Sequence, residues 1–280
     1  MRPVERVAIV GLGLIGGSLA RALAKRDVFV VAHDRRGDML DAAIRTGVVQ
    51  EQFTMRDGGT IEADVVILAT PVDAVIAVLP SLDRMFPRAR LIMDVASTKR
   101  SIVAAAEGAG LGERFVGAHP LTGSHRSGWF ASRASMFDEA RVFLSPTSST
   151  RAEALELATA FWRGLRSGVE IIDAAEHDVQ MAWRSHLPHM VSTTLALVLR
   201  DASIPRSALG PGGRDMTRLA GGAASMWTPI AADNQAALVE AIDAFAVHLR
   251  GLRDSIQARN THEITASLAR GSDWFDGEPG

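Results

Sequence analysis

Three glycines near the amino terminus have a spacing that suits a pyrophosphate. Gly11, Gly13 and Gly16 form the pattern G-x-G-x-x-G, between an apolar run and a helical pattern that begins with Leu14 and Ile15. The first glycine allows a tight turn, the second exposes bare backbone to the phosphates, and the third lets the helix pack closely. Because free N–H groups at the start of a helix favour an anion, we expect these five residues to bind a dinucleotide. An ordinary glycine-rich turn is the alternative.

The residues that follow the second apolar run bear on which dinucleotide binds. The run 28–32 is followed by Asp34, whose carboxylate can accept hydrogen bonds from the ribose hydroxyls of NAD and repels a 2′-phosphate. Arg35 and Arg36 could receive that phosphate, although a solvated loop also explains them. We therefore expect NAD, with Asp34 and Arg35 near its ribose, and NADP is the alternative.

Two further loops carry polar side chains to the ends of apolar strands. The run 63–69 ends at Thr70 and Pro71, and the run 90–95 leads into a loop that holds Ser97. Ligands of a doubly wound sheet bind at the carboxyl ends of its strands. Thr70 and Pro71 should therefore contact the cofactor, and Ser97 should point toward its nicotinamide. Capping of the next helix is a second, compatible role for Ser97.

His119 stands directly before Pro120, after the short apolar run 115–118, so an extended backbone is expected there. An imidazole in this place can act as a base near neutral pH. Taken alone, a histidine of this kind is more often hydrogen-bonded within the structure than catalytic, so both interpretations stay open at this point.

A helical pattern between residues 173 and 200 holds a group of polar side chains, namely His177, Asp178, Ser185, His186 and His189. Pro188 lies inside this pattern and predicts a kink, since proline removes a backbone hydrogen bond. His186 and His189 share one helix face, but no third ligand stands at helical spacing, so we expect no metal site.

Two arginines follow a glycine-rich loop further along the chain. Arg214 and Arg218 belong to a short helical pattern, with Asp215 between them. Glycines and an arginine at a helix start can bind a carboxylate, because guanidinium makes two parallel hydrogen bonds to it. A solvated cluster paired with Asp215 is the alternative.

The elements that must position these residues divide the chain in two. Strand and helix patterns alternate up to residue 150 and predict a Rossmann-type doubly wound α/β domain, whereas the rest predicts an all-α domain. We expect residues 1–150 to bind the dinucleotide and residues 151–280 to form a helical substrate and dimerisation domain. In this prediction 141–145 is the last strand.

Within the helical part, we expect Ser149 or Thr150 to cap the first helix, a long helix over 230–258, a shorter one over 261–270, and a frayed tail. The apolar faces of residues 190–200 and 236–249 exceed what one small helical layer can cover. They predict a homodimer.

Composition excludes several classes of function. The chain has 280 residues, a net charge of −2 and no cysteine, so a basic nucleic-acid surface, disulfides and thiolate chemistry are not expected. No apolar run reaches the roughly 18 residues of a membrane-spanning helix. A strand pattern close to Met1 leaves no room for a secretory signal, which predicts a cytoplasmic protein.

Five blocks, in order along the chain, resemble the prephenate/arogenate dehydrogenases of tyrosine biosynthesis. They are GLGLIGGS (11–18), DVASTK (94–99), GAHPLTGS (117–124), EHD with SHLPH (176–178 and 185–189), and GGRDMTRLA with MW (212–220 and 226–227). The resemblance implies a Rossmann domain, a helical domain that makes the dimer, and an active site in the cleft between them. The implied reaction is the NAD(P)-dependent oxidative decarboxylation of prephenate to 4-hydroxyphenylpyruvate.

The resemblance also implies roles for single residues. His119 would accept the proton of the ring hydroxyl as hydride leaves, and Ser97 would orient the same centre. Arg218 would bind a substrate carboxylate, and the helical domain would contribute His186 and His189, with His189 meeting the substrate. The expected catalytic residues are thus His119, Ser97 and His189, and the expected substrate-binding residues are Arg218, His186, Ser185 and Arg214.

One departure from the family pattern concerns the substrate. Many prephenate enzymes carry an acidic residue shortly after HP-x-x-G, where this chain has His125 and Arg126. A loop without a carboxylate is a poor partner for the ammonium group of arogenate. This favours the pyruvyl substrate, with arogenate and 4-amino-4-deoxyprephenate as alternatives.

Two other functions are alternatives for a chain with a dinucleotide-binding domain followed by helices. A β-hydroxyacid dehydrogenase would need a lysine in the second domain, but no lysine follows Lys99. A protein that senses NAD without turnover would need neither His119 nor Arg218.

Overall fold

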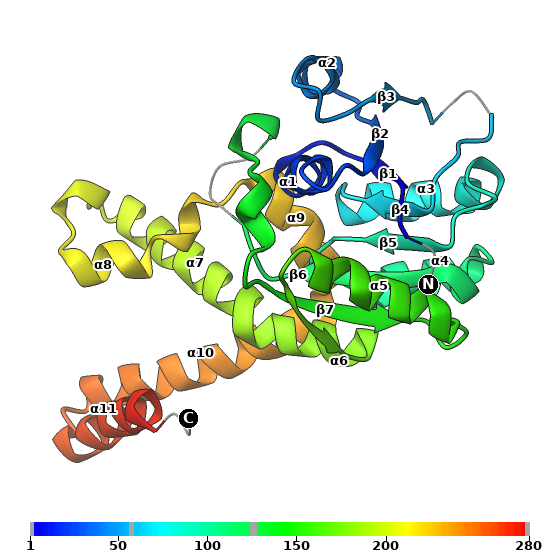
Figure 1. Cartoon of the computed structure of the whole chain (residues 1–280). Coiled ribbons are helices and arrows are strands. Elements are labelled where there is room, and N and C mark those ends of the chain that lie inside the picture. Colours follow the sequence, from blue (N-terminus) through cyan, green and yellow to red (C-terminus); the bar gives the residue numbers. More distant parts are fainter. Residues whose placement is uncertain (1–2, 56–58, 124–127, 278–280) are drawn as a thin grey trace.

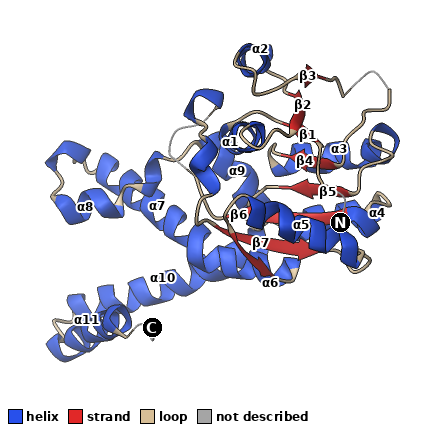
Figure 2. Cartoon of the chain, viewed as in Figure 1, coloured by secondary structure: helices blue, strands red, loops and turns tan. Residues whose placement is uncertain are grey.

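The computed structural model describes residues 3–55, 59–123 and 128–277. The first part of the chain forms an α/β body with helices on both sides of a sheet (Figures 1 and 2). Its strands are β1 (Arg6–Val10), β2 (Phe29–His33), β3 (Glu51–Gln52), β4 (Val65–Leu68), β5 (Leu91–Asp94), β6 (Phe115–Pro120), β7 (Arg141–Pro146) and β8 (Gly168–Ile171). Its helices are α1 (Leu14–Ala24), α2 (Gly37–Arg45), α3 (Val72–Met85), α4 (Arg100–Gly108) and α5 (Ala152–Gly164), with short 3-10 turns η1 (Gly112–Arg114), η2 (Trp129–Ala131) and η3 (Ala134–Phe137).

The strands form one sheet in the order β3-β2-β1-β4-β5-β6-β7-β8. Every neighbouring pair is parallel except β6 and β7, which run antiparallel. The strands β4, β5 and β6 are buried along their whole length, because α1, α2 and α5 cover one face of the sheet and α3 and α4 cover the other. Burial on both faces explains their continuous apolar sequences. The predicted Rossmann-type fold is confirmed.

The sheet extends beyond the predicted last strand. Residues 141–145 form β7 as expected, but β8 follows and pairs with β7 in parallel, Arg141 lying opposite Gly168. The prediction of a last strand at 141–145 is therefore wrong. β8 was not recognised because it is four residues long and largely exposed, and so lacks an apolar run. We propose that the α/β domain ends after Ile171, rather than at residue 150.

Helices make up the rest of the described chain. They are α6 (Ala174–Met181), the π-helical segment η4 (Ala182–His186), α7 (Leu187–Asp201), η5 (Arg206–Ala208), α8 (Pro211–Met216), η6 (Leu219–Gly221), α9 (Ala224–Asp233), α10 (Gln235–Gln257) and α11 (Thr261–Asp276). In Figure 1, α7 with α8 and α10 with α11 extend from the α/β body as two arms, while α9 returns to contact α3. None of the described helices is long and apolar enough to cross a membrane.

Two helix boundaries differ from the prediction. The helix expected over 230–258 is divided at Asn234, which ends α9 and precedes α10. The helix expected over 261–270 continues to Asp276, so most of the tail is helical rather than frayed.

Pro188 stands inside a helical stretch that runs from Ala174 to Asp201, directly after the π-helical turn η4, so the regular α-helix is interrupted next to this proline. Another prediction of local geometry is wrong. Ser149 and Thr150 do not cap α5, which begins after Arg151 without a side-chain cap. The Thr150 hydroxyl instead donates to the carbonyl oxygen of Phe115 at 2.8 Å.

Candidate active site

The glycine turn between β1 and α1 has the geometry that a pyrophosphate site needs. Gly11 has a φ of +97°, in the region that favours glycine. A Cβ on Gly16 would lie 1.9 Å from the Gly11 carbonyl oxygen, so only glycine lets α1 start this close to the turn. No atom lies within 4 Å of the place where a Cβ on Gly13 would stand. The backbone at Gly13 is therefore open to a ligand, and the first turn of α1, with Leu14 and Ile15, faces it.

Asp34 is held against this turn. Its carboxylate accepts a hydrogen bond from the backbone N–H of Leu12 at 2.6 Å and another from Arg36 at 2.8 Å. The Arg36 side chain pairs with Asp38. Arg35 makes no side-chain contact of this kind within the described parts of the chain and stays free to meet a ribose or its phosphate.

The end of β4 borders the same turn. Thr70 follows it, and its methyl group would lie 2.9 Å from a Cβ on Gly11. The Thr70 hydroxyl is buried and has no hydrogen-bond partner among the described residues. Pro71 is the N-terminal flanking residue of α3. An unpartnered buried hydroxyl beside the glycine turn fits a dinucleotide whose polar groups would satisfy it.

His119 lies on β6 and is joined to two polar residues of α6. Its Nδ1 atom lies 2.9 Å from Nε2 of His177, and Nδ1 of His177 lies 2.7 Å from a carboxylate oxygen of Asp178. Burial, together with the charges of His177 and Lys99, lowers the pKa of His119 well below its usual value. His119 is thus neutral at physiological pH, the form in which it can accept a proton.

Asp178 also holds the first turn of α4. Its two carboxylate oxygens accept hydrogen bonds from the backbone N–H groups of Lys99 at 2.8 Å and Arg100 at 3.0 Å. The cap of α4 therefore comes from α6, and the prediction that Ser97 caps this helix is wrong. Ser97 is half-buried in the loop between β5 and α4, and its hydroxyl makes no hydrogen bond with the described residues.

Below Ser97, a buried ion pair joins the end of β5 to the start of α4. The Lys99 ammonium group contacts the carboxylate of Asp94, and both side chains are fully buried. Burial raises the pKa of Asp94 and lowers that of Lys99, and the contact between the two opposes both effects. This pair fixes the loop that carries Ser97 at the carboxyl edge of the sheet.

His186 is the last residue of the π-helical turn η4. The side-chain amide of Asn234 donates to its Nδ1 atom at 3.1 Å and to the backbone carbonyl of Asp178 at 2.7 Å. Burial lowers the pKa of His186 to about 4. Its Nε2 atom is buried and has no partner among the described residues, so this neutral imidazole has one ring nitrogen to offer to a ligand.

His189 lies three residues further, on α7, and stacks on Trp227 from α9. The two rings are 3.6 Å apart at their centroids and nearly parallel. Gly222 makes this stack possible, because a Cβ there would lie 2.6 Å from the ring of His189 and 2.7 Å from Nε1 of Trp227. Burial lowers the pKa of His189.

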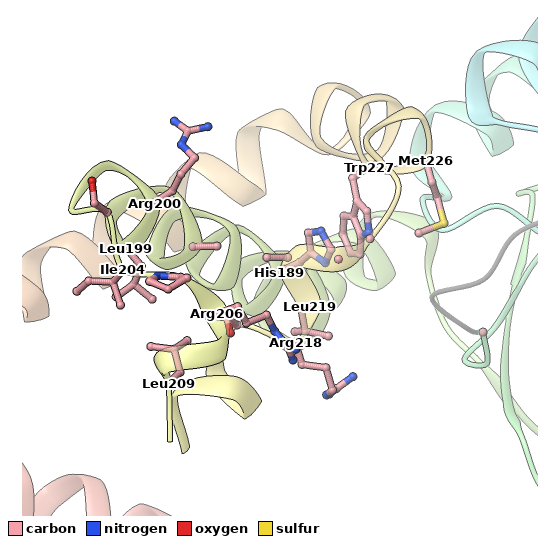
Figure 3. Close-up of a pocket in the computed structure, with 18 of the residues that line it drawn as sticks. His189, Leu199, Arg200, Ile204, Arg206, Leu209, Arg218, Leu219, Met226 and Trp227 are labelled. Atoms are coloured by element: carbon pink, nitrogen blue, oxygen red, sulfur yellow. The ribbon is translucent and has the colours of Figure 1, made fainter. Parts of the chain in front are cut away.

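A pocket of about 1430 Å³ opens beside this stack and extends along α7 toward α8. Figure 3 shows His189, Trp227 and Arg218 at one end of it and Arg200 with Ile204 at the other. Arg133 lines the pocket from the α/β body. His119 and Ser97 do not line it, but the neighbouring His186 ring packs edge-on against Trp227 at 5.9 Å and so adjoins it.

The charges that line the pocket are all of one sign. Arg133, Arg200, Arg206 and Arg218 contribute to its wall, and no carboxylate does so among the residues described. Arg200 pairs with Asp201. The guanidinium groups of the other three have no ion pair or hydrogen bond within the described ranges, so the pocket suits an anion.

Some expected residues are not brought to this pocket. Arg214 points to the backbone carbonyl of Ser207, at 3.4 Å, and does not line the pocket. Ser185 is half-buried on η4 and also lies outside its wall. His125 and Arg126 fall outside the described residues. No group of three or more metal-ligating side chains occurs in the parts of the chain that the structure describes.

The structure adds residues to which the sequence assigned no role. His177 and Asp178 belong to the EHD block at 176–178. His177 is 58 residues from His119 in the sequence, and no local pattern predicts the hydrogen bond between them. Asn234 and Trp227 are likewise joined to the histidines only by the fold. Arg133 stands 14 residues after His119, and no sequence pattern singled it out.

Comparison with known proteins identifies the family of this chain. Residues 19–171 match the family model "Prephenate dehydrogenase, nucleotide-binding domain", and residues 173–270 match "Prephenate dehydrogenase, dimerization domain". The chain is 30% identical to a prephenate dehydrogenase of Bacillus subtilis (strain 168) over 285 residues, which cover 98% of this chain and 76% of that protein.

Solved structures of similar proteins superpose on nearly the whole chain. Prephenate dehydrogenase from A. aeolicus, in complex with hydroxyphenyl propionate and NAD+, has a TM-score of 0.88 and 28% identity, and the match covers 97% of each chain. Arogenate dehydrogenase from Synechocystis has a TM-score of 0.80 and 28% identity, covering 97% of this chain and 99% of that one.

Proposed function

The chain belongs to the prephenate dehydrogenase family, and from this premise we propose that it oxidises prephenate with NAD+ and releases CO2 and 4-hydroxyphenylpyruvate. The observation that carries the proposal is the pairing of two features. A neutral, buried imidazole stands on β6, and the pocket that opens beside His189 and Trp227 has only cationic groups among the charged side chains of its described wall. Prephenate needs both, because it loses a proton from a hydroxyl and carries two carboxylates.

For the oxidation of prephenate, the protein must accept one proton and hold the substrate in position for hydride transfer. As the hydrogen on the hydroxyl-bearing ring carbon leaves as hydride, the hydroxyl becomes a carbonyl and its proton passes to Nε2 of His119. NAD+, when bound, accepts the hydride. The ring carboxylate then departs as CO2, the electrons of its bond aromatise the ring, and the proton returns to the phenol oxygen. We assign the orientation of the hydroxyl to Ser97.

Substrate recognition is assigned to the pocket wall. Arg218 is proposed to bind one carboxylate, since its guanidinium is free and lines the pocket beside His189. The unpartnered ring nitrogen of His186 is proposed as a donor to substrate oxygen. Because no carboxylate lines the described wall, the ammonium group of arogenate or of 4-amino-4-deoxyprephenate would lack an ionic partner there. This favours the pyruvyl substrate.

We assign the cofactor as NAD+ rather than NADP+. Asp34 stands at the end of β2 beside the glycine turn, and its carboxylate would repel a 2′-phosphate. Gly13, Thr70 and the first turn of α1 fit the pyrophosphate and its flanking groups. A homologous structure contains NAD+, which supports the same choice.

We propose that the protein is a homodimer held by its helical domain. The arms formed by α7 to α8 and α10 to α11 carry apolar side chains that a single chain leaves exposed, among them Val198, Val239, Val247, Leu249 and Leu268. Such faces are typical of subunit interfaces. Light scattering at micromolar concentration tests this, and a monomer would contradict it.

The experiment for the whole proposal follows absorbance at the NADH band. Purified protein is mixed with NAD+ or NADP+ and with prephenate or arogenate in turn. We expect the highest kcat/KM with NAD+ and prephenate. Absence of turnover with any pair, together with tight NAD+ binding, would instead support the NAD-sensing alternative.

A further inference from the structure

We propose that Asp178 is the centre of a hydrogen-bond network that holds His119 and His186 in opposite tautomers. In this arrangement Nε2 of His119 is an unprotonated acceptor, and Nε2 of His186 carries hydrogen and is a donor. The inference rests on the proposed function only for the use made of the two atoms. The tautomers themselves follow from contacts within the protein.

The first branch begins at the side chain of Asp178. Both of its oxygens receive backbone N–H groups, from Lys99 and Arg100, so this carboxylate acts as an acceptor throughout. Nδ1 of His177 lies 2.7 Å from one of these oxygens and must therefore carry hydrogen. In a neutral ring the other nitrogen of His177 is then a lone pair.

The tautomer of His177 determines the tautomer of His119. The lone pair on Nε2 of His177 faces Nδ1 of His119 at 2.9 Å, so Nδ1 of His119 is the donor of this bond. Nε2 of His119 is left without hydrogen, which is the state that a base needs before substrate binds. Asp178 does not touch the reacting atoms in this scheme. It and His177 are positioning residues.

An imidazolium form of His177 would reverse this order, and the surroundings oppose it. His177 is fully buried, with Phe143 of β7 packed edge-on against it at 5.6 Å. A charge on this ring would be buried with it, and the bond to Asp178 requires only the hydrogen on Nδ1.

The second branch begins at the backbone of Asp178. Its carbonyl oxygen accepts a hydrogen bond from the side-chain amide of Asn234, which fixes the nitrogen of that amide on this side. The same amide nitrogen lies 3.1 Å from Nδ1 of His186 and can only donate to it. Nδ1 of His186 is therefore the lone pair, and the hydrogen resides on its buried, unpartnered Nε2.

The test reads both tautomers directly, without substrate. Protein labelled with 15N in histidine is studied at pH 8 by two-bond 1H–15N correlation, and signals are assigned by their loss in His119→Asn and His186→Asn. We expect hydrogen on Nδ1 of His119 and on Nε2 of His186. Hydrogen on Nε2 of His119, or a doubly protonated His177, would overturn the proposal.

Two variants then separate the branches and serve as controls for each other. His177→Phe keeps a ring against Phe143 but removes the acceptor, so His119 should lose its fixed tautomer while His186 keeps its own. Asn234→Ala should release His186 and leave His119 unchanged. If either variant alters both imidazoles equally, the network does not act in separate branches, and the proposal fails.

A third variant guards against simple misfolding. His177→Gln places an amide oxygen within reach of Nδ1 of His119 and should restore its tautomer. In kinetics, His177→Phe should lower kcat by about 100-fold with KM within twofold, and His177→Gln should recover part of that loss. Equal kcat in the two variants would contradict the scheme. A wild-type protein with the expected tautomers but no turnover of prephenate would refute only the proposed function.

Discussion

The backbone N–H of Lys99 donates a hydrogen bond of 2.8 Å to the side chain of Asp178, 79 residues later in the chain. This contact joins the first turn of α4, in the α/β domain, to the first helix of the helical domain. The loop that carries Ser97 and the helix that carries His177 are thereby held together. The two halves of the proposed site are thus fixed to each other by a buried charge at a helix terminus.

Replacement of the proposed base should affect turnover. In His119→Asn the proton of the ring hydroxyl has no acceptor in the transition state, and we expect kcat to fall by about 10² to 10⁴ while KM changes little. NADH formation with prephenate at saturating NAD+ measures both. Turnover close to wild type would remove His119 from the mechanism and make His186 or His189 the base to test next.

Replacement of Arg218 should affect substrate binding. The carboxylate that it is proposed to hold is charged before and during the reaction, so Arg218→Ala should raise KM by about 10- to 100-fold, as expected for one charge-assisted hydrogen bond of about 1.5 to 3 kcal/mol. Arg214→Ala is the matched comparison, because Arg214 lies outside the pocket, and its KM should stay within about twofold. A larger effect of Arg214→Ala would restore the role that the sequence suggested for it. If Arg218 holds the carboxylate that leaves as CO2, kcat will fall as well.

Asp34→Ser should shift the choice of cofactor. Without the carboxylate, the repulsion of a 2′-phosphate disappears and Arg35 is free to receive it, so the ratio of kcat/KM for NAD+ to that for NADP+ should fall by about 10-fold or more. The ratio is measured with both cofactors on wild type and variant. A wild-type enzyme that already prefers NADP+ would refute the role of Asp34.

Gly222→Ala tests the stack of His189 on Trp227. The new methyl group would lie 2.6 Å from the His189 ring, so the stack must move and KM for prephenate should rise several-fold. Gly212→Ala is the matched control, because no atom lies within 4 Å of a Cβ at Gly212 and this residue does not line the pocket. Equal kinetics in the two variants would show that the stack does not position the substrate.

Stability should fall with pH below the ordinary histidine range. The pKa of His186 is about 4 in the folded protein and about 6.5 in the unfolded chain, so the unfolded chain binds the proton more readily. The stabilising effect of the neutral ring is complete above pH 6.5 and is lost progressively as the pH falls toward 4. At pH 5 this one group should lower the free energy of unfolding by about 2 kcal/mol relative to pH 8.

Urea unfolding at pH 5 and pH 8 measures that difference. His119 and His189, whose pKa values are also lowered, should add to it. In His186→Phe the difference between the two pH values should shrink by about 2 kcal/mol, whatever the absolute stability of the variant. An unchanged difference would mean that His186 is not buried in its neutral form.

The parts of the fold that the sequence predicted are those with local causes. The glycine turn, the two strands β1 and β2 that flank it and α1, and Asp34 stand within 30 residues of one another, and together they form a pattern that few other structures share. β8 escaped prediction because its residues are mostly exposed and it owes its place to pairing with β7.

The site was predicted in its residue types rather than its contacts. His189 and Arg218 line one pocket and His186 packs against Trp227 beside it, whereas His119 lies on β6 outside the wall of that pocket. The cap of α4 could not be predicted, because it comes from Asp178, which is 79 residues from Lys99 in the sequence. Nothing in the sequence distinguishes Asp178 from other polar residues as the partner of this helix. Long-range hydrogen bonds leave no periodic pattern in the sequence. Arg214 was predicted to bind substrate because it belongs to a motif block, but in the structure it lies outside the pocket.

The π-helical turn η4 holds about one residue more than a turn of an ordinary α-helix. Each added residue rotates everything after it by about 100° around the helix axis. Within the stretch from Ala174 to Asp201, His177 and His189 would differ by about 120° around the axis of a regular helix, and the residue added in η4 reduces this difference to about 20°. Deletion of one residue in η4 would undo this offset, so the length of this segment is under stricter constraint than most of its individual side chains.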